Sequence, residues 1–253
     1  MSKLLDKLNQ VSRGSAPPLG FRSVVVAPKS PRMVLIAVLS AGDAPAIAAA
    51  KENADAVLLS EAESTIFFEK LEQLAASLGE LPWGVSLGEA SEEQLSRLKG
   101  AGCDFLVCDA EKAPLMLLRK GEMGRIVKVE PSLPDGLLRA TAQLPIDVVL
   151  IGGEPSLSVQ RLMVCQHLVN LVHKPLVARA PLDISSEDLR ELWETGLAGV
   201  VVKVAGEARE GLSGLRQAIE SLPLARRRRG EKAEALLPYL GEEEEITEVE
   251  EEE

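Results

Sequence analysis

Two lysines stand near the ends of apolar runs, where a lysine is costly to place. Lys128 lies in the run RIVKVE (125–130), and Lys203 lies in the run VVVKVA (200–205). Removing an ammonium group from water is unfavourable unless the group is paired or used. A desolvated lysine has a lowered pKa and can act as a Schiff-base nucleophile or a general base. A lysine paired with a carboxylate on a neighbouring strand has a structural role instead, and the sequence leaves both alternatives open.

Acidic and anion-binding residues accompany the other apolar runs. Asp109 and Glu130 are placed to give or accept protons, and Arg179 offers a guanidinium that can bind an anion through two hydrogen bonds. We predict that Lys128, Glu130 and Asp109 are catalytic. The predicted substrate-binding residues are Arg179, Lys203, Gly152, Gly153, Glu154, Ser60 and Ser86. The alternative is a ring of mixed charge whose members only neutralise one another.

Each candidate residue ends or follows a short run of apolar residues. The chain contains eight such runs, rich in branched side chains that mostly do not alternate with polar ones. This pattern is typical of strands buried on both faces. The runs are 34–39, 56–59, 83–87, 104–108, 125–129, 147–151, 175–178 and 199–204. Stretches with apolar residues at helical spacing lie between them, so the sequence predicts a repeated strand–helix unit.

Eight consecutive units predict a (β/α)8 TIM barrel of the α/β class. The chain has 253 residues, a length typical of one such barrel. An open, doubly wound sheet is the alternative, but a closed barrel leaves no edge strand exposed. The predicted barrel covers residues 33–223. Polar residues that follow its strands would gather at its C-terminal mouth.

The segments outside the barrel have their own expected structures. Residues 1–32 form an N-terminal extension, with an amphipathic helix over 1–14 and a hairpin arm over 21–27 that covers the N-terminal mouth. Residues 224–240 are predicted to be a basic linker followed by a short helix, and residues 241–253 a disordered acidic tail. Like charges at the density of this tail repel one another and cannot bury surface.

The charge distribution argues against nucleic acid as a partner. The net charge is −11, but nine Glu residues lie within 242–253, so the rest of the chain carries only −2. A protein that binds the phosphate backbone needs a basic face. Aromatic residues that could stack on bases make up only 3% of the chain. No apolar run is long enough to cross a bilayer, so a membrane is not expected as a partner either, and a homo-oligomer is left open.

Cysteine, histidine and glycine patterns assign no metal and no cofactor. Cys103, Cys108 and Cys165 lack paired spacing, which is typical of reduced thiols in a cytoplasmic protein. His167 and His173 have no Cys, Asp or Glu at ligand spacing, so no metal site is predicted. Neither a dinucleotide-binding fingerprint nor a P-loop is present, so the cofactor stays unassigned. The N-terminus has no signal-peptide pattern.

The segment 174–204 (KPLVARAPLDISSEDLRELWETGLAGVVVKV) combines several features of one barrel superfamily. Pro175 precedes an apolar strand, SEDL (186–189) opens a helix, and Gly196 and Gly199 lead into the next apolar strand. In these features the segment resembles the last third of the phosphate-binding TIM barrels. That superfamily includes the thiamine-phosphate and indole-glycerol-phosphate synthases and the flavin-binding barrel oxidoreductases. The resemblance implies a barrel that binds phosphate at the ends of its seventh and eighth strands.

The chain departs from this superfamily at the implied phosphate site. The relatives end the seventh strand with a glycine pair whose N–H groups hold the phosphate, whereas this chain has Arg179, Ala180 and Pro181 there. Pro181 has no N–H to donate. The eighth strand runs into Lys203 rather than into glycine and a small residue. Arg179 and Lys203 are therefore predicted to replace the backbone cradle with side-chain charge.

Three functions are compatible with these features. The first is an enzyme of lyase or isomerase type that acts on a small anionic metabolite, phosphorylated or not, at the C-terminal face of the barrel. The alternative is a non-catalytic, degenerate barrel that serves as a scaffold, with the acidic tail as an interaction arm. The third is a flavin-binding oxidoreductase, which needs the phosphate turn that this chain lacks.

Overall fold

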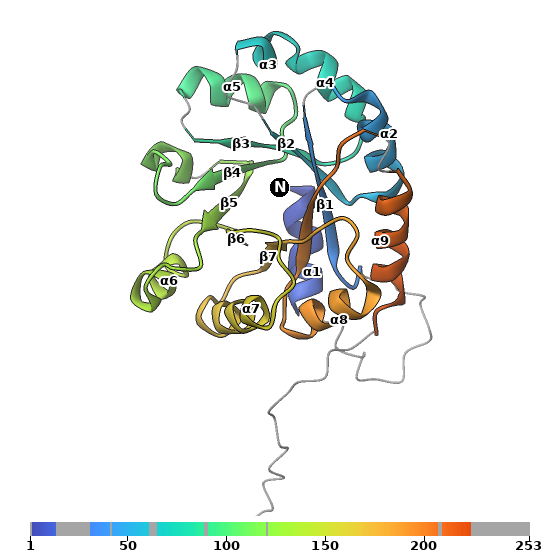
Figure 1. The fold of residues 1–253 in the computed structure, drawn as a ribbon. Helices are drawn as coiled ribbons and strands as arrows, with labels where there is room; N and C mark the ends of the chain where they lie inside the picture. Colours follow the sequence, from blue (N-terminus) through green and yellow to red (C-terminus); the bar gives the residue numbers. More distant parts are fainter. Residues whose placement is uncertain are drawn as a thin grey trace, which may run out of the picture.

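Eight parallel strands form a closed barrel in which each strand pairs with the next and β8 pairs with β1 (Figure 1). The computed structural model describes residues 2–13, 31–40, 42–60, 65–88, 91–119, 121–206 and 209–223. The strands are β1 (Val34–Ser40), β2 (Ala56–Ser60), β3 (Trp83–Leu87), β4 (Phe105–Asp109), β5 (Gly124–Val129), β6 (Val148–Ile151), β7 (Leu176–Arg179) and β8 (Gly199–Lys203). The predicted fold is confirmed, and each predicted strand agrees with the observed one to within one residue at either end.

One helix precedes the first strand, and the others follow the strands and surround the barrel (Figure 1). They are α1 (Lys3–Arg13), α2 (Ala44–Asn53), α3 (Thr65–Glu69), α4 (Leu71–Leu78), α5 (Glu92–Gly100), the 3-10 helix η1 (Leu115–Leu118), α6 (Asp135–Thr141), α7 (Val159–Leu171), α8 (Ser186–Glu194) and α9 (Arg209–Ser221). A capping box formed by Ser91 and Gln94 begins α5. Lys70 separates α3 from α4.

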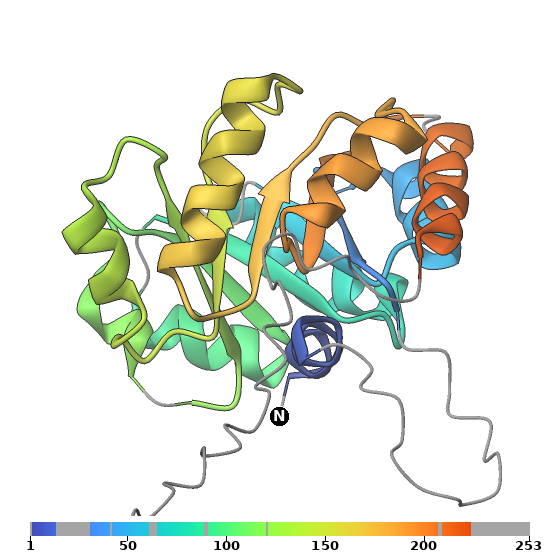
Figure 2. The ribbon, with the colours of Figure 1, turned by 90° about the horizontal axis from the view of Figure 1, so that it is seen from below.

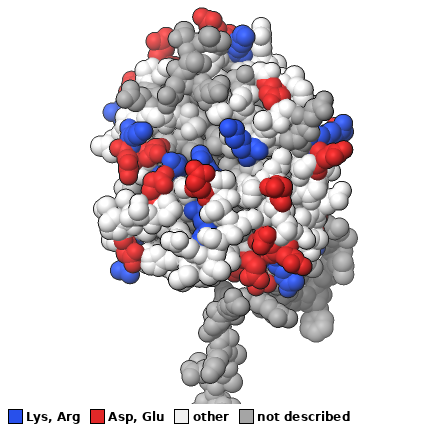
Figure 3. All heavy atoms as spheres, in the orientation of Figure 1, with Lys and Arg blue, Asp and Glu red and all other residues white. Residues whose placement is uncertain are grey.

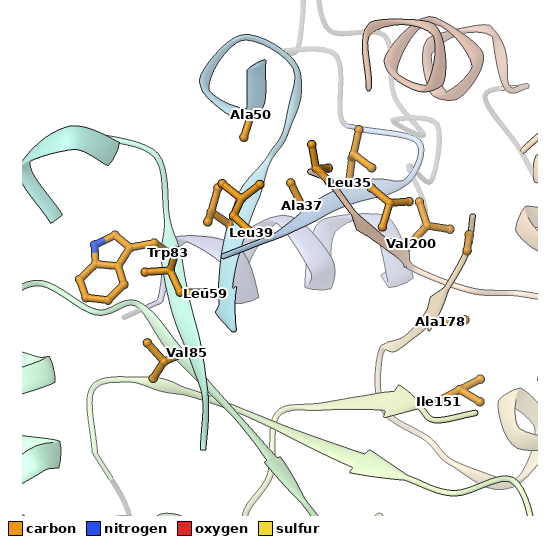
Figure 4. Packing of buried hydrophobic residues seen from close by; sticks show 14 of the residues in the cluster. Leu35, Ala37, Leu39, Ala50, Leu59, Trp83, Val85, Ile151, Ala178 and Val200 are labelled. Carbon is orange, nitrogen blue, oxygen red and sulfur yellow. The ribbon is translucent and has the colours of Figure 1, made fainter. Parts of the chain in front are cut away.

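The outer face of the strands packs against the helices. Leu35, Leu39, Leu59 and Val85 are buried in this layer, and Figure 4 shows them among their neighbours. Successive residues of a strand point to opposite faces, so the residues between them face the inside of the barrel. Aliphatic side chains dominate the layer, as the low aromatic content of the sequence requires.

A second, smaller core fills the inside of the barrel. Ile36, Leu58, Phe105 and Ile126 belong to it, and each is at most 5% exposed. Phe105 is the one aromatic residue of this cluster of described residues, and Gly84 makes room for it. A Cβ atom on residue 84 would lie 2.4 Å from the phenyl ring. The lower part of the barrel is therefore solid, and only its upper end is available for a site.

Helix α1 closes the N-terminal mouth of the barrel, and Figure 2 shows it at that end. Leu4 and Leu8 are completely buried in the inner core. Gly124, the first residue of β5, allows this approach, because a Cβ atom there would lie 3.0 Å from Leu5 Cγ. The helix predicted over 1–14 is therefore present and forms the floor of the barrel. The predicted hairpin arm over 21–27 lies outside the described residues.

Two aspartates fix α1 to the barrel. Asp104 accepts hydrogen bonds from the backbone N–H groups of Lys3 (2.8 Å) and Leu4 (3.0 Å) at the start of the helix. Asp55 is buried and pairs with Lys7 of α1. A carboxylate at a helix N-terminus satisfies free N–H groups and interacts favourably with the helix dipole. The division into residues 33–223, 224–240 and 241–253 stays a prediction. The segments 224–240 and 241–253 lie outside the described residues.

Candidate functional site

The predicted polar residues share one face at the C-terminal mouth. Lys128 comes two residues after Ile126, and Lys203 comes two residues after Val201, so both continue inward-facing rows of the inner core. The same alternation places further predicted residues on inward-facing positions. These are Ser60, Ser86, Asp109, Gly152 and Arg179. Neither lysine points into the helix layer, and the barrel therefore brings the predicted site residues to one mouth.

On the β4–β5 side of the mouth, Lys128 lies between two carboxylates. Its Nζ is 3.2 Å from Asp109 Oδ2 and 2.7 Å from Glu130 Oε1. Asp109 and Lys128 are partners in the register of β4 and β5, which explains their proximity. The side chains of these residues are 25 to 35% exposed. The pairing corresponds to the structural alternative for Lys128, although water still reaches all three groups.

The ion pairs determine the protonation state of Lys128. The hydrogen bond to Glu130 raises the pKa of Lys128 above its ordinary value of 10.5, and Asp109 adds to this effect against the opposing effect of burial. Burial alone would raise the pKa of Asp109. The hydrogen bonds from the Glu111 N–H and Lys128, together with the charges of Lys128 and Lys112, outweigh it and lower that pKa below 3.8. At neutral pH, Lys128 is therefore an ammonium ion and Asp109 is a carboxylate.

On the β7–β8 side of the mouth, two cations have no carboxylate partner among the described residues. Arg179 and Lys203 are exposed at the ends of β7 and β8. Within the part of the chain that the structure describes, no acidic side chain pairs with either of them. Arg179 is opposite Val201 in the sheet, so Lys203 lies one inward-facing position further along. Strand geometry separates their Cα atoms by about 8 Å, so both side chains can contact one small anion.

Charged groups of both signs are mixed over the face that carries this mouth. Figure 3 shows Lys and Arg side chains interspersed with Asp and Glu, with no broad area of one sign. This distribution does not provide the basic face that nucleic acid requires. Among the described residues, the β4–β5 side of the mouth therefore holds ion pairs and the β7–β8 side holds two cations, within a face of mixed charge.

The loop after β6 supports Glu130. A Cβ atom on residue 152 would lie 2.6 Å from Glu130 Oε1, so Gly152 is required for the carboxylate to occupy its position. Gly153 has a φ of 84°, which glycine adopts without strain. Glu154 is exposed in the same loop.

Arg161, in the first turn of α7, holds the loop after β6 in place through hydrogen bonds. It is buried and donates hydrogen bonds to the carbonyl oxygens of Gly152 (2.8 Å) and Ile151 (3.4 Å). The sequence analysis missed this residue. The available signal was a cation in the first turn of a helix, where the helix dipole disfavours positive charge.

Three backbone positions in the corner between β7 and β8 offer no free N–H group to a ligand. The Ala180 N–H donates to Val201 O (3.0 Å), and Pro181 has no N–H. The Gly206 N–H donates to Asp43 Oδ2 (2.9 Å). Asp43 also caps α2, because its other oxygen accepts from the Ala46 N–H (3.1 Å). A carboxylate of the protein itself thus uses the N–H group that follows β8.

An apolar side chain packs against the first turn of α9 in the same corner. Leu182, in the loop after β7, lies against the first turn of α9, where a Cβ atom on Gly211 would be 3.0 Å from Leu182 Cγ. Glu210 adds a negative charge to this first turn. In many barrels a phosphate binds between the loops after strands 7 and 8 and a helix N-terminus. Here the corresponding corner contains leucine and carboxylates.

The other candidate nucleophiles are two serines at the strand ends and the buried cysteines. The Ser60 hydroxyl donates to Leu39 O (3.1 Å), whereas Ser86 is exposed. Burial raises the pKa of Cys103 to about 12 and that of Cys108 to about 11, so neither is a thiolate at neutral pH. Among the described residues, no three His, Cys, Asp or Glu side chains are arranged to hold a metal ion. His167 pairs with Asp135 at the surface.

Two cavities lie outside the mouth. One of about 290 Å³ lies beside η1, lined by Leu95, Leu106 and Met123, where the short 3-10 helix leaves part of β4 uncovered. The other, of about 510 Å³, lies between α2 and α9 and is lined by Glu52 and Arg209. Arg209 and Glu52 pair with each other. No helix in the described ranges is long and apolar enough to span a membrane.

Solved structures share this fold at low sequence identity. A mutant tryptophan synthase α-subunit from Pyrococcus furiosus is 16% identical, with a TM-score of 0.57 over 75% of this chain and 97% of that one. Thiamine phosphate pyrophosphorylase from the same organism is 16% identical, with a TM-score of 0.58 over 75% of this chain and 96% of that one. Neither a protein-family model nor a curated protein matches the sequence. The chain is a (β/α)8 barrel similar in fold to these two proteins.

Proposed function

We propose that the chain is a barrel enzyme of lyase or isomerase type that acts on a small anionic metabolite at its C-terminal mouth. The observation that carries this proposal is the pair of cations on β7 and β8. Arg179 and Lys203 face the mouth without a carboxylate partner among the described residues, whereas the ion pairs at the N-terminal end are closed within the protein. Charges of one sign that lack partners among the described residues, at the C-terminal mouth of a barrel, are typical of a ligand site.

The two sides of the mouth have different roles in this proposal. Arg179 and Lys203 bind the anionic group of the substrate, which leaves the remainder of the molecule directed toward the β4–β5 side. Glu130 and Asp109 are the candidate proton acceptors, and Glu130 is the more exposed of the two (35% against 27%). Lys128 provides positive charge between them. This gives each of the three predicted catalytic residues a place beside the bound substrate.

The chemistry that fits this arrangement is removal of a proton from a carbon next to a carbonyl group. Glu130 accepts the proton, the electrons of the C–H bond form a carbon–carbon double bond, and the carbonyl oxygen takes the negative charge. The Lys128 ammonium stabilises that charge. Because its pKa is raised, we assign Lys128 this electrostatic role in place of the free-amine roles of base or Schiff-base nucleophile. Return of the proton elsewhere completes an isomerisation, and loss of a group from the enolate completes a lyase reaction.

A thermal-shift screen against small carboxylates, phosphorylated sugars and nucleotides tests the proposal. A ligand at about 100 times its Kd should add about 2.7 kcal/mol to the free energy of unfolding. The stabilisation should be lost in Arg179→Met and Lys203→Met and kept in Arg139→Met, a matched control on the exposed face of α6. Stabilisation by no compound in the screen, or stabilisation that survives both mouth substitutions, would refute the site.

The scaffold alternative is favoured by a different observation. Leu182 and Asp43 occupy the corner between β7 and β8, as expected of a barrel that has lost a ligand site. A barrel that binds none of the screened compounds but retains a protein partner would support this alternative. The same filled corner disfavours a flavin-binding oxidoreductase, and a purified protein without flavin absorbance bands would exclude tight flavin binding.

A cytoplasmic location is part of the proposal as well. Its support is that all three cysteines are free and buried, since disulfides are common in oxidising compartments. The substrate is a metabolite and not a nucleic acid or a membrane lipid. The acidic tail and a homo-oligomeric state are not needed for this chemistry.

A further inference from the structure

We infer that the anionic group recognised at the mouth is a carboxylate and not a phosphate monoester. This inference rests on the proposed function, because it specifies the ligand of the same site. It is based on the backbone donors, the charges and the packing in the corner between β7 and β8. Phosphate binding there would depend on backbone N–H groups and a helix N-terminus.

Two backbone N–H groups of this corner are already used, and one position has none. Ala180 and Gly206 donate to acceptors of the protein itself, at 3.0 and 2.9 Å, and Pro181 has no donor. A phosphate that displaced the Asp43 carboxylate from Gly206 would also have to leave α2 without its cap, because Asp43 holds both N–H groups. The corner is therefore built around an internal carboxylate.

Charge and packing oppose a phosphate at the same place. A phosphate monoester carries close to two negative charges at neutral pH. The carboxylate of Asp43 and the first-turn residue Glu210 would repel it. Leu182 packs against Gly211 in the first turn of α9, so an apolar side chain lies beside this helix end.

The donors that remain suit a carboxylate. Arg179 presents a planar guanidinium that matches the two oxygens of a carboxylate with two parallel hydrogen bonds. Lys203 adds a second positive charge about 8 Å away between Cα atoms, by strand geometry. A carboxylate can place both of its oxygens on these two side chains, so it does not depend on the backbone donors that a phosphate site uses.

The width of the barrel limits the size of the ligand. Eight strands spaced about 4.8 Å apart and tilted by about 36° give a ring roughly 15 Å across between backbones. Side chains from both sides extend into this space, with Arg179 and Lys203 opposed by Lys128 and Glu130. A chain of only a few carbons fits between them. The ligand class is therefore a short-chain oxo- or hydroxycarboxylate. The carbon that carries its oxo or hydroxy group reaches the Lys128 side.

Matched pairs of compounds that differ only in the anionic group test the inference. We would titrate the full chain by calorimetry with 4-oxopentanoate against hydroxyacetone phosphate, and with 4,5-dihydroxypentanoate against glycerol 3-phosphate. In each pair the main chains have the same number of atoms, because an ester oxygen and a phosphorus atom of the phosphate compound replace a CH2 group and the carboxyl carbon of the carboxylate. The expected result is that at least one carboxylate binds at least tenfold more tightly than its phosphate partner. Arg179→Lys should reduce the affinity for that carboxylate about tenfold, because lysine keeps the charge and loses the two-pronged geometry.

A second variant isolates the part played by Asp43. Asp43→Asn keeps a good helix cap and removes the negative charge. The expected result is a severalfold gain in affinity for the phosphate member of the pair, with the carboxylate affinity unchanged. A phosphate monoester that binds wild-type protein as tightly as its carboxylate partner, and loses binding in Arg179→Met, would overturn the inference and leave the proposed function standing. If all four compounds and the whole thermal-shift screen fail to bind, the proposed function fails and the inference fails with it.

Discussion

The two ends of the barrel differ in how their charged residues are paired. At the N-terminal end, Asp55 is buried and satisfied by Lys7, Arg216 and the Leu35 N–H. At the C-terminal end, two cations point into the mouth without acidic partners among the described residues. The same strands contribute to both ends, so the difference does not come from the fold. It separates residues that keep the barrel closed from residues that are available to a ligand.

The two ends also differ in packing, because the N-terminal end is filled with buried side chains and the mouth is partly exposed. Helix α1 inserts Leu4 and Leu8 among the first residues of the strands and excludes water from the lower part of the barrel. The mouth holds side chains that are a quarter exposed or more, such as Lys128 and Glu130. Substitutions at the lower end should therefore change stability, and substitutions at the mouth should change binding. The predictions below test this separation, beginning with the largest effect.

The largest loss of stability is expected from Leu8→Ala. Leu8 is completely buried between α1 and the inner core, so its truncation leaves a cavity in the floor of the barrel. The expected loss in the free energy of unfolding is about 2–5 kcal/mol, measured by denaturant titration. Leu115→Ala is the matched control, because Leu115 is 81% exposed and should cost little. Equal effects of the two substitutions would show that α1 does not seal the barrel.

A smaller loss is expected from Asp55→Ala. The substitution removes the acceptor of the Leu35 N–H and the common partner of Lys7 and Arg216. Because both cations can turn toward water, the expected cost is about 2–3 kcal/mol, mainly from the buried backbone donor. Asp183→Ala, at an exposed aspartate in the loop after β7, is the control. A cost below 0.5 kcal/mol, on the order of an ordinary surface substitution, would contradict the assigned role.

The ionic group on β4 and β5 should contribute least, and its contribution should depend on pH. Asp109→Asn is expected to cost less than about 1 kcal/mol at pH 7, since these groups are partly exposed. The pKa of Asp109 is lower in the folded protein than its ordinary value of 3.8. The wild-type advantage should therefore be complete above that value and disappear as the pH falls through the lower, folded pKa.

Unfolding curves of wild type and Asp109→Asn between pH 2 and 7 measure this difference, with Asp183→Asn as the pH-matched control. A wild-type advantage that grows as the pH falls would mean that Asp109 is not stabilised as a carboxylate in the folded barrel.

Much of the fold was predictable because each strand carries its own signal. The eight apolar runs predicted the strands, and their ends predicted which polar residues share the mouth. The pairing of Lys128 with Asp109 was accessible only as one of two alternatives, because the register of β4 and β5 decides it. The sequence could not show that Asp43, after β1, accepts from the Gly206 N–H, after the neighbouring strand β8, because that contact joins loops far apart in the chain.

The candidate site was predictable as a set of residues but not as a set of roles. Alternation along a strand places Arg179 and Lys203 at the mouth. That they lack acidic partners among the described residues depends on every neighbouring side chain, which no local pattern encodes. Arg161 was missed for the same reason, because its function is to hold the Gly152 carbonyl from a different element.

The most direct test of the separation between the two ends is one measurement on Arg179→Met combined with Lys203→Met. The free energy of unfolding of this double variant would be determined with and without the tightest ligand of the screen. Without ligand it should stay within about 0.5 kcal/mol of wild type, because neither side chain supports the fold. With ligand at about 100 times the wild-type Kd, the wild-type gain of about 2.7 kcal/mol should disappear. A double variant that loses several kcal/mol without ligand, or keeps the gain with it, would contradict the account.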